Sequence, residues 1–245
     1  MTKELEFLID LVKNASTLIE DNIEINAKGD KGDIVTNYDL AIEKYMIEKM
    51  NKYYPNFSIV SEEYNKDESL KENSFIIDPI DGTVNFANGL PLWGIQVACV
   101  KDGKPCAAVI YLPRLNELYY ADENGSFMND KKISVNDKSL YNGVFSIEGP
   151  NNIVSEFKMR PISRNYRDFH CAAIDFSYVA NGRSCGTCFM CDNLWDYMPG
   201  LYIAKMAGAK VYDNPGLHIV ANSDETLKIL LENTKDVQNE KLIIE

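Results

Sequence analysis

A change in hydrophobic period along the chain most constrains how it can fold. Between Trp93 and Ile133, short runs rich in Val, Ile and Tyr alternate with turn residues such as Asp102-Gly103. This pattern predicts an antiparallel meander of short strands, over residues 93–101, 105–112, 117–121 and a pair around Phe127 and Ile133. The elements on either side of the meander therefore decide which layered architecture the chain adopts.

Helical periodicity precedes the meander, and a mixed pattern follows it. Apolar residues three and four apart predict one helix from Lys3 to Asp21 and a second from Asp39 that Pro55 ends. Strands are predicted at 57–60, 75–77, 144–147, 187–190, 210–212 and 218–221, and further helices at 171–180, 195–207 and 224–232. The order of elements predicts layered helices and sheets, α+β first and α/β afterwards.

Length and charge bound the classes of protein that fit. A chain of 245 residues forms one large domain or two closely packed halves, which we place at 1–140 and 141–245. Its net charge of −12 disfavours nucleic acid and anionic membranes as partners. No apolar run approaches the ~18–20 residues that span a bilayer, and the N-terminus lacks a signal-peptide pattern. We therefore expect a cytoplasmic protein.

Three cysteines are spaced like the beginning of a metal-ligand set. Cys185, Cys188 and Cys191 form a C-x2-C-x2-C run, which is typical of iron–sulfur or zinc sites. No fourth ligand follows nearby, and only Cys171 lies upstream. The alternative, which we favour, is a buried strand that uses cysteine as a small apolar residue.

The segment 75–86 carries the strongest chemical signal. Its apolar start predicts a buried strand that ends in Asp78 and Asp81, with a proline between them. Adjacent buried carboxylates repel one another unless a divalent cation or a raised pKa relieves them. Gly82 and Thr83 then offer backbone N–H groups that suit an anion. The segment could hold a phosphate ester, although Asp-Pro and Asp-Gly are also ordinary turn sequences.

Two more acidic segments follow predicted elements in the same way. Glu62 and Glu63 close the strand at 57–60, and Asp196 stands at the mouth of the helix at 195–207. A solvated loop and a helix N-cap would explain each segment separately. Their joint occurrence favours one acidic site.

These segments resemble the signatures of the inositol monophosphatase family, which is magnesium-dependent and lithium-sensitive. Residues 78–86, DPIDGTVNF, resemble its D-P-[IL]-D-G-T-x-N-F signature. Residues 32–39 resemble its D-x-V-T-x-x-D element, 61–63 its G-E-E, and Trp195-Asp196 its W-D. The resemblance implies a layered αβαβα sandwich of the sugar-phosphatase type and a homodimer.

The resemblance also implies roles for individual residues. The implied ligands of two or three Mg²⁺ ions are Glu62, Asp78, the carbonyl of Ile80, Asp81 and Asp196. Asp39 and Thr83 would activate a metal-bound water, with Glu63 supporting the water shell of the metal. The implied substrate-binding residues are Asp81, Gly82, Thr83, Ala172 and Phe189. Chemically this is in-line displacement by a metal-activated water.

The second half departs from the family pattern where the substrate is chosen. Phe189 stands where inositol phosphatases often place a glutamate, and residues 170–173 replace the usual Gly-Ser/Thr-Ala-Ala. We expect a Mg²⁺-dependent phosphomonoesterase acting on a small polyol or sugar phosphate. One alternative is a phosphatase of fructose-1,6-bisphosphate or 3′-phosphoadenosine 5′-phosphate, whose second phosphate could meet Arg160, Arg164 and Arg167. Another is a metal-binding regulatory homologue without turnover.

Overall fold

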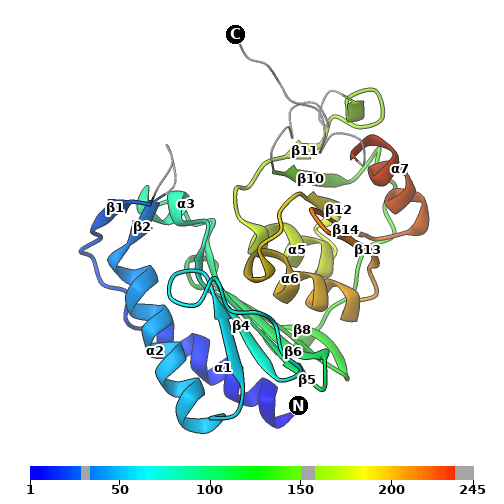
Figure 1. Ribbon diagram of the computed structural model, residues 1–245. Helices are drawn as coiled ribbons and strands as arrows, with labels where there is room; N and C mark the ends of the chain where they lie inside the picture. Colours follow the sequence, from blue (N-terminus) through cyan, green and yellow to red (C-terminus); the bar gives the residue numbers. More distant parts are fainter. Residues whose placement is uncertain (29–33, 150–157, 235–245) are drawn as a thin grey trace.

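The computed structural model describes residues 1–28, 34–149 and 158–234 and arranges them in alternating layers of helix and sheet (Figure 1). The first layer holds α1 (Lys3–Ser16) and α2 (Asn37–Tyr53), and the central helical layer holds α5 (Ala172–Ala180) and α6 (Leu194–Met206). A seven-stranded sheet lies between these two layers, and a five-stranded sheet separates the central helices from α7 (Asp224–Thr234). The expected αβαβα sandwich is confirmed.

The seven-stranded sheet contains the predicted meander. Its strand order is β3-β4-β5-β6-β7-β8-β9, and only the β3–β4 pair is parallel. The strands are β3 (Ser58–Ser61), β4 (Ser74–Asp81), β5 (Gly94–Lys101), β6 (Lys104–Leu112), β7 (Glu117–Asp122), β8 (Gly125–Met128) and β9 (Lys131–Lys132), with the short helix η1 (Pro113–Leu115) after β6. The central strands are buried on both faces, which explains their nearly continuous apolar sequences.

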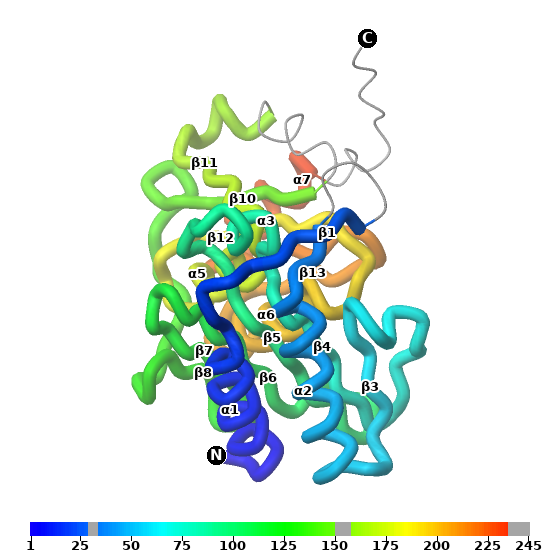
Figure 2. The backbone as a smooth tube through the Cα atoms, turned by 90° about the vertical axis from the view of Figure 1, so that its left-hand side faces the viewer, coloured from blue at the N-terminus to red at the C-terminus, as the bar shows by residue number. Residues whose placement is uncertain are grey.

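Helices α1 and α2 cover one face of this sheet, as Figure 2 shows from the side of the helices. Their apolar stripes place Leu8, Val12, Ile42 and Met46 fully out of solvent. Helix α1 ends at Ser16, short of the predicted end at residue 21, because side-chain hydroxyls near its end bond the last helical carbonyls.

The five-stranded sheet has the order β11-β10-β12-β14-β13. Its strands are β10 (Val144–Glu148), β11 (Tyr166–Arg167), β12 (Ser184–Phe189), β13 (Lys210–Asn214) and β14 (Leu217–Ala221). One face packs on α5 and α6, and the other packs on α7 through Leu230. Strand β12 begins three residues before the predicted strand because Ser184 and the two residues after it are also buried.

Three short elements near the predicted site were not assigned from periodicity. Strands β1 (Ile25–Ala27) and β2 (Ile34–Thr36) form an antiparallel pair, and Gly82 is followed by the one-turn helix α3 (Thr83–Ala87). Such elements are too short to show a hydrophobic period. The division at residue 140 stays a prediction, since α5 and α6 contact both sheets. Among the described residues, no helix is long and apolar enough to cross a membrane.

Candidate active site

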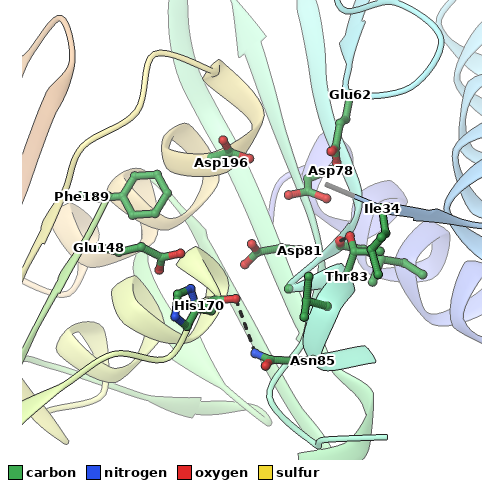
Figure 3. Close-up of a pocket in the computed structure, with 13 residues that line it drawn as sticks. Ile34, Glu62, Asp78, Asp81, Thr83, Asn85, Glu148, His170, Phe189 and Asp196 are labelled. Atoms are coloured by element: carbon green, nitrogen blue, oxygen red, sulfur yellow. Dashed lines mark hydrogen bonds between the residues drawn. The ribbon is translucent and has the colours of Figure 1, made fainter. Parts of the chain in front are cut away.

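The end of β4 presents two aspartates to one side of the sheet. Asp78 pairs with Gln96 on β5, and Asp81 pairs with Gly94, so β4 carries one extra residue at this point. This irregularity falls at Pro79, which has no N–H to donate to the ladder. The extra residue re-aims the strand, and both carboxylates lie in one pocket (Figure 3).

The pocket has a volume of about 500 Å³ and gathers residues from both sheets. Of the residues predicted for the site, it is lined by Glu62, Asp78, Ile80, Asp81, Gly82, Thr83, Phe189 and Asp196. The remaining lining residues, none of them assigned to the site from the sequence, are Ile34, Val84, Asn85, Glu148 and His170. Acids that are as much as 134 positions apart along the chain, from Glu62 to Asp196, therefore share one cavity.

The two β4 aspartates differ in their hydrogen bonds. Asp78 Oδ2 accepts from Gln96 Nε2 at 3.2 Å, whereas Asp78 Oδ1 is buried without a hydrogen-bond partner among the described residues. Asp81 Oδ2 accepts from the Ala173 N–H and from Cys171 Sγ, the latter at 3.1 Å. Helix α5 therefore begins against Asp81, whereas Asp78 keeps a buried oxygen without a partner among the described residues.

Glu62 and Glu63 both pair with one lysine. Lys28 Nζ lies 2.9 Å from Glu62 Oε1 and 2.6 Å from Glu63 Oε1. Burial lowers the pKa of Lys28, but the two glutamates outweigh it and raise that pKa above its usual value. The ammonium group of Lys28 thus compensates part of the negative charge beside the pocket.

Glu43, which the sequence did not assign to the site, fixes the turn that carries these glutamates. Its carboxylate accepts hydrogen bonds from the Ser61 hydroxyl and from the N–H groups of Glu63 and Tyr64. Glu43 is fully buried on the apolar face of α2, four residues after Asp39. The sequence signal that could have identified Glu43 is an acid on the otherwise apolar face of a predicted helix.

Asp39 and Thr83 meet at the edge of the pocket. Thr83 Oγ1 lies 3.3 Å from Asp39 Oδ1 and donates to the carbonyl of Ile80 at 2.9 Å. The other oxygen of Asp39 closes a capping box at the start of α2, accepting from the N–H of Thr36 at 2.8 Å. The cap fixes the position of Asp39, and the backbone around Gly82, which has a φ of 81°, brings Thr83 to it.

Asp196 is the third residue of α6, and the N-cap position is taken by Asn193. Its Oδ2 accepts from Cys191 Sγ at 2.9 Å and from Asn193 Nδ2 at 3.1 Å. Cys185 and Cys188 are buried in β12. Their burial supports the favoured interpretation of cysteine as a small apolar residue in a strand, and no group of three Cys, His, Asp or Glu side chains among the described residues is arranged to hold a metal.

Burial and mutual repulsion raise the pKa values of the pocket acids. Burial, followed by neighbouring carboxylates, raises the pKa of Asp78 well above its usual range. Burial likewise raises the pKa of Asp81 to about 7, and that of Glu62 to about 8 even though Lys28 opposes the shift. Burial also raises the pKa of Asp39 to about 6. Lys28 therefore compensates only part of the negative charge that these acids carry when ionised.

The acidic residues of the pocket have the ligand chemistry that a hard divalent cation requires. Glu62, Asp78, Asp81 and Asp196 offer only oxygen ligands, and one oxygen of Asp78 has no partner among the described residues. The side chains do not yet converge in a coordination geometry, since Lys28 and Asn193 hold two of the carboxylates. Cation binding would therefore require side-chain rotation within the pocket.

Other predicted residues lie away from the pocket. Ala172 is buried at the start of α5, next to the Ala173 N–H that binds Asp81, but it does not line the cavity. Arg160 and Arg164 line a separate cavity, and Arg167 donates to the carbonyl of Tyr166. In this structure the arginines thus do not face the acids. The Gly32-Asp33 part of the N-terminal motif lies outside the described residues.

The layered αβαβα fold and the acid-lined pocket at the end of β4 define a protein of the sugar-phosphatase class. Residues 1–243 match the inositol monophosphatase family. A fructose-1,6-bisphosphatase/inositol-1-monophosphatase of Thermotoga maritima is 32% identical over 256 residues, covering 95% of this chain and 98% of that protein. The Nus factor SuhB of Escherichia coli K12 is 30% identical, covering 95% and 92% of the two chains.

A solved structure of the Thermotoga maritima IMPase has a TM-score of 0.86 and 31% sequence identity to this chain. The match covers 96% of this chain and 100% of that one. The chain therefore belongs to the inositol monophosphatase family, as the sequence motifs indicated.

Proposed function

We propose that the protein is a Mg²⁺-dependent phosphatase that hydrolyses a small polyol or sugar phosphate with a metal-activated water. Membership of the family supports hydrolysis of a phosphomonoester, and the Thermotoga relative is named for both an inositol monophosphate and a fructose bisphosphate activity. One observation carries the proposal: Glu62, Asp78, Asp81 and Asp196 line a single pocket in which an oxygen of Asp78 has no partner among the described residues.

The four carboxylates and the carbonyl of Ile80 would hold two or three Mg²⁺ ions. When bound, the ions would polarise the phosphoryl oxygens and lower the pKa of a coordinated water. Within the protein, Gln96 holds one oxygen of Asp78, and the start of α5 holds Asp81. The backbone of Gly82 and Thr83 would bind the phosphate beside these acids.

Asp39 and Thr83 would orient the attacking water. Thr83 Oγ1 can accept a proton from that water only as it passes its own proton to Asp39, 3.3 Å away. Asp39 is fully buried and Thr36 holds its second oxygen, so its first oxygen faces Thr83. Glu63 would support the same end of the pocket through Lys28, to which it is bonded.

The described pocket wall favours a monophosphate over a bisphosphate. None of the described residues that line it is Lys or Arg, and the arginines suggested for a second phosphate line another cavity. A homodimer, implied by the family resemblance, is part of the proposal. Light scattering in solution tests it directly.

Phosphate release from a panel of inositol, sugar and nucleotide phosphates, with and without Mg²⁺, tests the function. We expect turnover of polyol or sugar monophosphates only with Mg²⁺. Asp78→Asn should lower kcat by about 10²-fold or more, because it removes a charged oxygen from the centre of the site. Asp10→Asn, on the exposed face of α1, is the matched control. Mg²⁺ binding by calorimetry without release from any phosphate would contradict an enzyme and favour a regulatory role.

A further inference from the structure

Glu148 closes β10 in the pocket wall that faces Asp81 (Figure 3). No role was expected for it from the sequence, although it closes a strand with an acid as Glu62 and Asp81 do. Its Oε2 is buried and has no hydrogen-bond partner among the described residues, and its charge acts on the pKa of Asp81. The side chain as a whole is only partly buried and lines the pocket, so it can meet a ligand there.

Phe189 lies beside Glu148. The two residues are register partners on the parallel strands β10 and β12, and both line the pocket. Residues paired across neighbouring strands project from the same face of a sheet. The wall opposite the β4 aspartates therefore combines an aromatic ring with a carboxyl group. A ring packs on the C–H face of a polyol or sugar, and a carboxyl oxygen accepts from its hydroxyl groups.

Asp175 is a second acid next to Glu148. It lies in the first turn of α5, fully buried, and its carboxyl group interacts with that of Glu148. Two neighbouring carboxyl groups disfavour each other's charge, and the helix N-terminus favours the charge on Asp175. Burial and then Asp175 raise the pKa of Glu148 well above its usual range.

We propose that Glu148 selects the leaving group, with its carboxyl group accepting a hydrogen bond from a substrate hydroxyl that lies against Phe189. The inference rests on the proposed function and narrows it to monophosphates of polyols or sugars with a free hydroxyl near the ester. A second phosphate at this position would face Glu148, and His170 is the one lining residue among those described that could carry positive charge. Bisphosphates should therefore be poorer substrates.

The test compares two monoesters in each variant: inositol 1-phosphate and p-nitrophenyl phosphate, whose leaving group has no further hydroxyl. In Glu148→Ala the ratio of kcat/KM for inositol 1-phosphate to that for p-nitrophenyl phosphate should fall at least about tenfold, mainly through KM. Glu148→Gln keeps an acceptor oxygen and should recover most of the ratio. Glu123→Ala, an exposed glutamate after β7, is the matched control for loss of an acid.

Several outcomes would overturn the inference. An unchanged ratio of the two kcat/KM values in Glu148→Ala, with an active wild type, would contradict it. A raised Mg²⁺ requirement at an unchanged ratio would make Glu148 a metal ligand instead. A wild type that hydrolyses neither these monoesters nor any other phosphate would remove the proposed function itself, so the two failures are distinguishable. Circular dichroism and Tm of both variants separate a binding defect from unfolding.

Discussion

Thr83 shows how one residue links the backbone of the site to its proposed chemistry. Its hydroxyl contacts two acceptors, the carbonyl of Ile80 and Asp39 Oδ1, from positions 3 and 44 residues away in the chain. The contact to Asp39 is the longer, at 3.3 Å against 2.9 Å. Passing its proton to Asp39 would therefore require the Thr83 hydroxyl to turn away from the carbonyl of Ile80.

Replacing Thr83 should lower turnover without unfolding the protein. In Thr83→Ala we expect kcat to fall about 10²- to 10⁴-fold, because the link from the water to Asp39 is lost. Thr83→Ser keeps the hydroxyl and should keep most of the activity. Steady-state phosphate release at saturating Mg²⁺ measures both. Equal losses in Thr83→Ser and Thr83→Ala would show that the methyl group, and not the hydroxyl, is what the site requires.

At this scale the sequence located the acids better than the residues that position them. Asp78 and Asp81 were predicted from a motif in which acids follow a buried strand, and both line the pocket. Glu43 and Glu148 carry weaker signals, since each is one acid in an apolar element. Only the tertiary fold shows that Glu43 bonds the turn after β3 and that Glu148 faces Asp81.

Among the helix pairs of the described chain, α5 and α6 have the most extensive contact, and α6 carries the last acid of the site. A Cβ at Gly200 would lie 2.5 Å from Phe176 Cβ and 2.7 Å from its ring, closer than atoms of this kind approach. Gly200 is the seventh residue of α6, and Asp196 is one turn earlier. The missing side chain at Gly200 therefore allows the α5–α6 contact that holds Asp196 beside the pocket.

Gly200→Ala should destabilise the protein even though alanine is the better helix former. Helix propensity would favour Ala by about 1 kcal/mol, but overpacking against Phe176 should cost about 1–3 kcal/mol, so we expect a lower Tm. Differential scanning calorimetry measures the change. Lys205→Ala, on the exposed side of the same helix, should leave Tm nearly unchanged. A Gly200→Ala variant with a raised Tm would show that the helices move apart at no cost.

The elements themselves were predictable wherever a hydrophobic period is long enough to read. The meander, α2 and α7 lie within a few residues of the predicted ranges. The pair β1 and β2 was missed because three-residue strands in a polar stretch show no period. Helix α6 continues through Pro199, its sixth residue, deeper than a proline is usually tolerated. Pro199 is buried at this point of the helix, which periodicity alone did not indicate.

On the scale of the whole molecule, the net charge of −12 is partly concentrated in one cavity. The turn after β3 and strand β4 of one sheet, strand β10 of the other sheet, and helix α6 between the sheets all contribute acids to its wall. Bringing these acids together without a cation lowers the stability of the fold by a free energy that depends on pH. Protons and divalent cations both neutralise the carboxylates and reduce this loss of stability, so the two should substitute for one another.

The metal-free protein should lose stability as pH rises from about 5 to 8. Carboxyl groups in the unfolded chain ionise near pH 4, whereas Asp81 and Glu62 in the fold have pKa values of about 7 and 8. The folded state therefore binds more protons than the unfolded state in this window, and the free energy of unfolding falls as they are released. We expect a loss of at least about 1 kcal/mol, or about 2–4 °C in Tm.

Mg²⁺ should restore more stability at pH 8 than at pH 5. It binds ionised carboxylates, and in the folded protein these acids are largely ionised at pH 8 but protonated at pH 5. Thermal unfolding in a chelator and in excess Mg²⁺, at both pH values, measures the two effects. Asp81→Asn removes one titrating acid, so its metal-free Tm should depend less on pH and its gain from Mg²⁺ should be smaller. A metal-free Tm that rises from pH 5 to 8, or an equal gain from Mg²⁺ at both pH values, would contradict a cation site built from these acids.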